Sequence, residues 1–235
     1  MEQEKWGIVG IGTLGGAILK QLSNGKRFID FYHPNAEKAA GIAQANPGHQ
    51  SLTVEELDSL DFLILALPAD RLVPFVQSLL DSGLSLTSVT LINMATVVKT
   101  AELNRQFPQL RFLGMKFMGH AVDLRERGNG LFITEPSERA ASAQERAIRF
   151  FEQIGQVIVD KEDVVEEVNS LATRIAVKAA FELEQAIREG GYRQEYASRA
   201  LVSVAPEVMR AYASGTMGHF ARKIVEQLLK EQQES

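Results

Sequence analysis

The stretch Lys5–Leu22, KWGIVGIGTLGGAILKQL, decides the fold of the N-terminal half. A short apolar run over 6–9 leads into a glycine-rich turn and then into a helical pattern of apolar residues. Strand, G-x-G-x-x-G turn and helix in this order are typical of a dinucleotide-binding site. The first glycine permits a tight turn, the second lets a pyrophosphate approach the backbone, and the third lets the helix pack closely. We predict that the cofactor diphosphate binds at Gly10, Ile11, Gly12, Thr13, Leu14 and Gly15. The alternative is a structural turn that has lost its ligand.

Composition and charge narrow the class of protein. The chain has 235 residues, of which 45% are hydrophobic and 23% charged, and its formal net charge is −5. The negative charge argues against nucleic acid or an acidic membrane as the main partner. Cysteine is absent, which excludes disulfides and thiolate sites. Because there is no signal-peptide pattern and no apolar run of about 20 residues, we expect a cytoplasmic protein.

Strand-like and helix-like segments alternate up to about residue 160. The clearest strand, 62–67, is uniformly apolar, as expected for a parallel strand covered on both faces. We expect Pro74 in the first turn of the helix that follows it, up to about Leu80. Further strands are predicted at 28–32, 89–93, 111–115, 130–134 and 156–160. This pattern predicts an α/β fold with a Rossmann-type doubly wound parallel sheet, in a domain spanning 1–160.

The rest of the chain, 161–235, has a helical pattern and is predicted to form a separate all-helical domain. One helix spans about 164–189, a second spans about 194–213 with a break at Pro206, and a third runs to about Lys230. Small apolar residues follow one face of the first helix, at Ala172, Ile175, Ala176, Ala179 and Ala180. This face favours packing against a second copy of the chain, so we expect a homodimer formed through these helices.

Ligands of doubly wound sheets bind outside the carboxyl ends of the strands. The residues expected to line the cofactor cleft at two of these ends are Ala66, Leu67, Pro68, Asn93 and Ala95. At the end of the second strand an acidic residue would select NAD, but His33 occupies the tip and Asp30 lies out of phase. We therefore expect NADP, with His33 and Asn35 as cofactor-binding residues, while NAD stays possible. Alternatively, His33 and Asn35 only cap the next helix, and both roles are compatible.

Together these segments resemble pyrroline-5-carboxylate reductase, in the broad 6-phosphogluconate-dehydrogenase-like group of Rossmann reductases. The turn at 10–15 is similar to that family's GxGxMG turn, and the segment 65–68 is similar to its A-V-K-P segment. The segment 116–120, KFMGH, falls where the family carries R-x-M-P-N beside the nicotinamide. The resemblance implies an NAD(P)H-dependent reductase whose C-terminal helices form a dimer and contribute to the substrate pocket.

The C-terminal half departs further from that family. The segment 169–173, NSLAT, stands where the family has G-S-G-P-A, and 214–217, SGTM, only faintly resembles its S-P-G-G-T-T loop. That loop closes over the imine substrate, so the resemblance implies a small-molecule substrate with a C=N bond. Two alternatives stay open, which are a C=O substrate and a regulatory relative that binds dinucleotide without turnover.

The candidate catalytic residues are His120, Lys116 and Thr216. A ketone would need a protein acid such as His120 or Lys116, whereas an imine can arrive protonated. The structural alternatives are a hydrogen-bonded loop histidine, a solvated lysine and a simple turn. Asn169 and Thr173 share a helix face and are candidate substrate-binding residues, with packing as the alternative. No metal site is predicted, because no histidine has partners at metal-ligand spacing.

Overall fold

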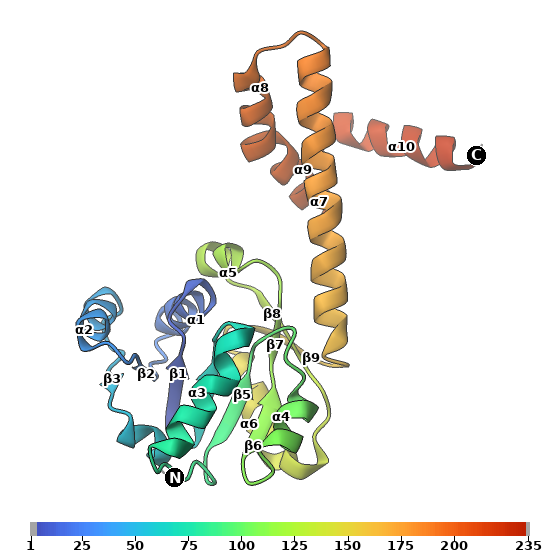
Figure 1. The fold of residues 1–235 in the computed structure, drawn as a ribbon. Helices are drawn as coiled ribbons and strands as arrows, with labels where there is room; N and C mark the ends of the chain where they lie inside the picture. Colours follow the sequence, from blue (N-terminus) through green and yellow to red (C-terminus); the bar gives the residue numbers. More distant parts are fainter. Residues whose placement is uncertain (1–3, 234–235) are drawn as a thin grey trace. The chain divides into compact units, whose positions relative to one another are not determined.

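A computed structural model describes residues 4–233, which form two compact units that divide between Ser170 and Leu171 (Figure 1). The first unit contains all of the strands in the described part of the chain, and the second is helical. None of the helices within 4–233 combines the length and hydropathy needed to span a membrane.

The main sheet has six strands in the order β3-β2-β1-β4-β5-β6, and every neighbouring pair is parallel. The strands are β1 (Trp6–Val9), β2 (Asp30–Tyr32), β3 (Ser51–Leu52), β4 (Phe62–Leu65), β5 (Thr90–Asn93) and β6 (Arg111–Gly114). This is the order of a doubly wound dinucleotide-binding sheet, and it reverses direction between β1 and β4. The predicted fold class is confirmed.

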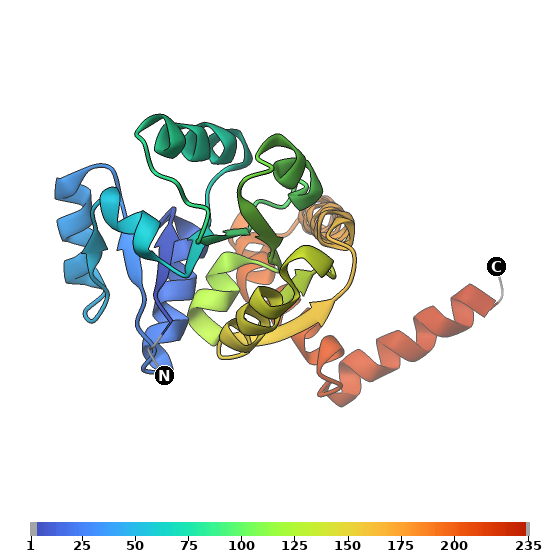
Figure 2. The ribbon, with the colours of Figure 1, turned by 90° about the horizontal axis from the view of Figure 1, so that it is seen from below.

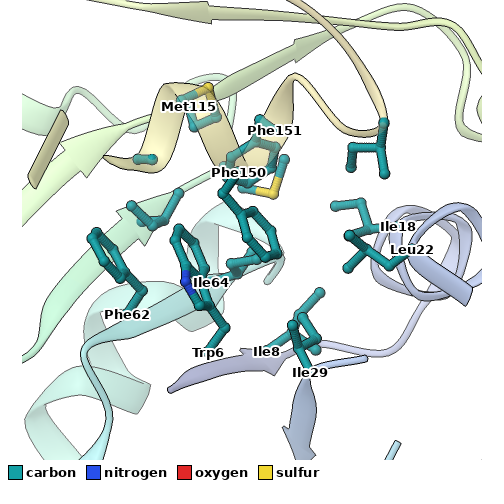
Figure 3. Packing of buried hydrophobic residues seen from close by; sticks show 14 of the residues in the cluster. Trp6, Ile8, Ile18, Leu22, Ile29, Phe62, Ile64, Met115, Phe150 and Phe151 are labelled. Atoms are coloured by element: carbon teal, nitrogen blue, oxygen red, sulfur yellow. The ribbon is translucent and has the colours of Figure 1, made fainter. Parts of the chain in front are cut away.

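Helices cover both faces of this sheet (Figure 2). They are α1 (Thr13–Asn24), α2 (Ala36–Ala45), α3 (Ala69–Asp81), α4 (Thr100–Gln106) and a 3-10 turn, η1 (Glu55–Ser59). Along β4, Phe62 and Ile64 join the cluster under α1, whereas Leu63 and Leu65 join the cluster under α3 and α4. The uniformly apolar sequence of β4 therefore reflects burial on two sides. Trp6 stacks between Phe62 and Phe150 within the first cluster (Figure 3).

A second, three-stranded sheet contains β7 (Lys116–Met118), β8 (Gly130–Thr134) and β9 (Gly155–Val159). The expectation that 130–134 and 156–160 extend the parallel sheet is wrong, because β8 pairs with β7 antiparallel and with β9 parallel. The segment 112–118 is apolar apart from Gly114 and Lys116, and no proline or polar loop separates β6 from β7, so the sequence does not reveal the change of sheet. The same unit contains α5 (Ala121–Arg127), the 3-10 turn η2 (Glu138–Ala140) and α6 (Ala141–Phe151).

One local prediction also needs correction. Helix α3 begins at Ala69, so Pro74 lies inside the helix rather than in its first turn. Residues Arg125–Arg127 form the last turn of α5.

Helix α7 (Asp163–Glu189) begins in the first unit and continues into the second (Figure 1). It is followed by α8 (Gln194–Arg199), a π-helical segment η3 (Ala200–Val204), α9 (Ala205–Ala213) and α10 (His219–Gln233). The irregularity expected near Pro206 takes the form of the π segment η3, and Pro206 lies in the first turn of α9, but α8, η3 and α9 follow one another without a non-helical residue between them. The predicted helical C-terminal region is confirmed.

Candidate functional site

The glycine turn after β1 has the geometry that a dinucleotide needs. Gly10 has φ +89°, and a Cβ added there would overlap the carbonyl oxygen of Ala66. A Cβ on Gly15 would overlap the carbonyl oxygen of Gly10, so the third glycine lets α1 approach the turn. By contrast, a Cβ on Gly12 would meet nothing within 4 Å. The space beside Gly12 is therefore open to a ligand.

The N-terminus of α1 has the character of an anion site. Gly12 is the N-cap residue, and no side chain caps this helix. The first N–H groups of an α-helix have no partner within the helix, and the helix dipole favours negative charge there. Thr13, Leu14 and Gly15 occupy the first turn and so have amides without an intrahelical partner, whereas Gly10, Ile11, Gly12 and Gly16 line the cleft described below.

The turn opens into a cleft of about 1300 Å³, which exceeds the roughly 300–1,000 Å³ of ordinary small-molecule pockets. Its walls come from the glycine turn, the end of β2, the faces of α1 and α2, and helix α3. The lining residues used below are Gly12, His33, Lys38, Leu67, Arg71 and Phe75. A ligand as long as a dinucleotide fits such a cleft.

The charge of the cleft is opposite to that of the whole chain. Four cationic side chains line it, and none of its lining residues is acidic. These cations are Lys20, Lys38, Arg71 and Arg125. Lys20 and Arg125 both lie beside Glu126, and Arg71 lies beside Asp70, whereas Lys38 has no ion pair within residues 4–233. A net positive lining in a protein of net charge −5 favours a polyanionic ligand.

At the end of β2, Asn35 has the helix-capping role that was the alternative to cofactor binding. Its side chain accepts a hydrogen bond of 2.8 Å from the Lys38 amide and so caps α2. His33 lines the cleft, and its Nδ1 accepts a hydrogen bond of 3.0 Å from the Asn35 amide. Asn35 does not line the cleft. The two predicted residues therefore differ in placement, and only His33 faces the ligand space.

Of the predicted strand-end residues, Leu67 lines the cleft, Ala66 lies against Gly10, and Pro68 is the N-cap of α3. Asn93 is fully buried, and its Nδ2 donates to the Val98 carbonyl and to Thr100 Oγ1. Its Oδ1 accepts from the Ala95 amide at 3.1 Å. Asn93 and Ala95 thus lie inside the loop that follows β5, and neither lines the cleft.

Lys116 is completely buried, so the alternative of a solvated lysine is wrong. Its Nζ donates hydrogen bonds of 2.6 Å to Ala95 O and 2.8 Å to Val98 O, and lies 3.6 Å from Glu162 Oε2. Burial lowers the pKa of Lys116 from 10.5 to about 8, and the nearby Glu162 carboxylate opposes this shift. The three neighbours occupy the ammonium group, which leaves no hydrogen directed at a substrate.

His120 is exposed and is the N-cap of α5, where its Nδ1 accepts from the Val122 amide at 3.3 Å. Asn169 Nδ2 donates to Phe117 O at 3.5 Å, which places Asn169 against β7. Thr173 and Thr216 are exposed residues of the second unit, and the Thr216 hydroxyl bonds the Ser214 hydroxyl at 2.7 Å. Lys116 and His120 thus lie on β7 and just after it, and Asn169 contacts β7 from α7, while none of the three lines the cleft. Within 4–233 no group of three His, Asp or Glu side chains is placed to hold a metal.

The sequence reasoning missed two features of the site. Glu162 pairs with the buried lysine, but in the sequence it is one acid in a charged run before a helix. Arg71 lines the cleft from the first turn of α3. The sequence signal for Arg71 is its position three residues after Pro68, just beyond the end of β4.

The fold and the cleft define a Rossmann-type protein with a C-terminal helical unit. No family profile and no curated protein matches the chain, whereas solved structures do match it. A pyrroline-5-carboxylate reductase from Coxiella burnetii is similar at 19% identity and TM-score 0.73, over 99% of this chain and 91% of that one.

Two further solved structures share the fold. A pyrroline carboxylate reductase from Plasmodium falciparum with NADP bound has 15% identity and TM-score 0.65, over 96% of this chain and 84% of that one. An imine reductase from Streptomyces aurantiacus has 17% identity and TM-score 0.65, over 96% and 78% of the two chains. At such identities the likeness establishes the common architecture.

Proposed function

We propose that the chain is an NAD(P)H-dependent reductase, preferring NADP, that transfers a hydride to a small imine. The observation that carries this proposal is the glycine turn, whose open face at Gly12 borders a cleft lined by cations and by no acid. The shared architecture supports it, because two similar structures contain NADP and two are imine reductases.

The bound dinucleotide would supply a hydride, which is a proton together with two electrons, to the carbon of the C=N bond. The chain's own contribution is binding and orientation. The amides at the start of α1 hold the diphosphate, and the end of β2 holds the adenosine ribose. Neither His120 nor Lys116 lines the cleft, and Lys116 is fully buried with its ammonium group on two backbone carbonyls. This favours a substrate that arrives as an iminium ion over a ketone, which would need a protein acid.

The NADP preference rests on the cations near the end of β2. A 2′-phosphate would add charge beside His33, where Lys38 and Arg71 also line the cleft. Lys38→Ala and Arg71→Ala should each raise the dissociation constant for NADPH several-fold and leave that for NADH nearly unchanged, because only NADPH carries the extra phosphate. Lys161→Ala, an exposed lysine that does not line the cleft, is the control.

The direct test is a titration of the protein with NADPH and NADH, followed by ligand fluorescence and by the melting temperature. Binding of either dinucleotide supports the proposal, and NADPH oxidation with a panel of cyclic imines completes it. If neither dinucleotide binds, the proposal fails. Tight binding with no turnover on imines or keto acids would support the regulatory alternative.

We also propose that the active form is a homodimer. In 171–233 only Ala197 is buried, while Leu171, Ile175, Phe181 and Phe220 are more than half exposed. A unit of this size with so small a core gains little from folding alone. Exposed apolar surface of this extent is typical of a protein interface.

A further inference from the structure

Lys116 and Glu162 form a buried charged pair that the hydride-transfer chemistry does not use. We propose that Lys116, held by Glu162, is a positioning residue that fixes the loop 94–99 for dinucleotide binding. This inference rests on the proposed function and adds a buried residue that acts on the cofactor site without contacting the cofactor.

The loop 94–99 follows β5, next to the strand ends that border the cleft. The Ala66 amide donates to Val9 O at 2.9 Å, and the Met94 amide donates to Leu65 O at 3.3 Å. The ends of β1, β4 and β5 thus continue side by side beyond the strands. No residue of 94–99 lines the cleft itself, but Val9 and Leu67 at the neighbouring strand ends do, so the loop would act on the cleft through these paired ends.

Lys116 holds two carbonyls of this loop from within the protein. Its ammonium group bonds Ala95 O and Val98 O, and Asn93 Nδ2 donates to the same Val98 O at 2.8 Å. Without Lys116 the Ala95 carbonyl would lose its shorter hydrogen bond and keep only the one from the Val98 amide at 3.3 Å, which weakens the hold on the loop. Between the two bonded carbonyls, the Val97 side chain stays 57% exposed at the tip of the loop.

Glu162 balances the charge of the buried lysine and ties it to the next helix. Its Oε2 lies 3.6 Å from Lys116 Nζ and accepts from the Thr100 amide at 3.1 Å. Its Oε1, buried without a hydrogen-bond partner in the described part of the chain, lies where a Cβ on residue 114 would be. Gly114 is therefore required for Glu162 to reach the lysine. Beside this pair, Lys99 bonds Asp163 in the first turn of α7.

The test compares NADPH binding with stability in variants of full-length protein. Lys116→Met keeps the length of the apolar stem but removes the donors, so the NADPH dissociation constant should rise by about tenfold or more. Gly114→Ala, which leaves the lysine intact but displaces Glu162, should change the constant in the same direction. Lys161→Met removes an exposed lysine next to Glu162, outside the loop and the cleft lining, and should leave the constant unchanged.

A further variant separates positioning from general loss of stability. Phe151→Leu alters a fully buried ring on α6 and should lower the melting temperature without affecting NADPH binding. If Lys116→Met and Gly114→Ala lower only the melting temperature, as Phe151→Leu does, Lys116 is merely structural and the inference is overturned. If the wild-type chain binds neither NADPH nor NADH, the proposed function fails as well, so the two failures are distinguishable.

Discussion

The three glycines of the turn after β1 differ in what they contribute, although the sequence pattern treats them alike. Gly10 and Gly15 face backbone carbonyls and serve the fold, whereas Gly12 faces open space, where the proposed cofactor diphosphate would lie. This separation makes stability and binding independently testable at neighbouring positions.

Gly10→Ala should destabilise the protein by about 2–4 kcal/mol, because a side chain there combines a positive φ with an overlap on Ala66 O. Gly12→Val should keep the wild-type melting temperature but abolish dinucleotide binding, because its side chain enters the space of the diphosphate. Thermal melts and NADPH titrations of both variants check this. NADPH binding by Gly12→Val at wild-type affinity would refute the placement of the diphosphate.

Lys116 should make stability depend on pH in the alkaline range. Its pKa is about 8 in the folded chain and 10.5 ordinarily, so between these values the unfolded chain binds more protons. The free energy of unfolding then rises with pH, by up to about 1.4 kcal/mol per pH unit, as the cost of burying the cation disappears. The charged groups that face Lys116 are Glu162, Lys99 and Glu135.

The measurement is urea unfolding of wild type and Lys116→Met from pH 7.5 to 10.5. Groups that titrate in both proteins cancel in the difference between them. The wild-type free energy should rise more steeply with pH than that of the variant. Two parallel curves would show that Lys116 titrates alike in the folded and unfolded states.

At the scale of elements, the sequence predicted those whose signals are local. The apolar run of β4, the glycine turn before α1 and the proline in the first turn of α9 all specify their structure within a few residues. The second sheet escaped prediction, because strand pairing is a non-local contact and β7 continues the apolar run of β6 without a break. The site shows the same division. Gly10–Gly15 are readable as a motif, whereas the Lys116–Glu162 pair joins residues 46 positions apart with no pattern to connect them.

Two variants test whether His33 and Asn35, between β2 and α2, bind the cofactor or cap the helix. Asn35→Ala removes the cap that Lys38 N–H requires and should cost about 1 kcal/mol of stability with no change in NADPH affinity. His33→Ala should weaken NADPH binding, because His33 lines the cleft. Urea unfolding and NADPH titration of both variants distinguish these roles. A large loss of NADPH affinity in Asn35→Ala would instead assign Asn35 to the cofactor.

At the scale of the whole molecule, the two units differ in how they are stabilised. The first has two apolar clusters, one on each face of its sheet, and the second leaves aromatic and aliphatic side chains exposed on α7, α9 and α10. The unfolded chain would gain little by ordering the second unit alone, since conformational entropy opposes it. In the proposed homodimer, a second copy of the chain would supply the missing apolar surface.

Light scattering should therefore give a mass near twice the 25.9 kDa of one chain. Ile175→Glu places a carboxylate on the small-residue face of α7 and should shift the protein to monomer, because a buried unpaired charge is costly. Arg174→Glu introduces the same acid on the opposite side of this helix and should leave the dimer intact. Circular dichroism of Ile175→Glu should show reduced helix content together with the lower mass, since the exposed helices lose their partner. A wild-type mass of one chain, with the helices fully formed, would refute this account of how the second unit is held together.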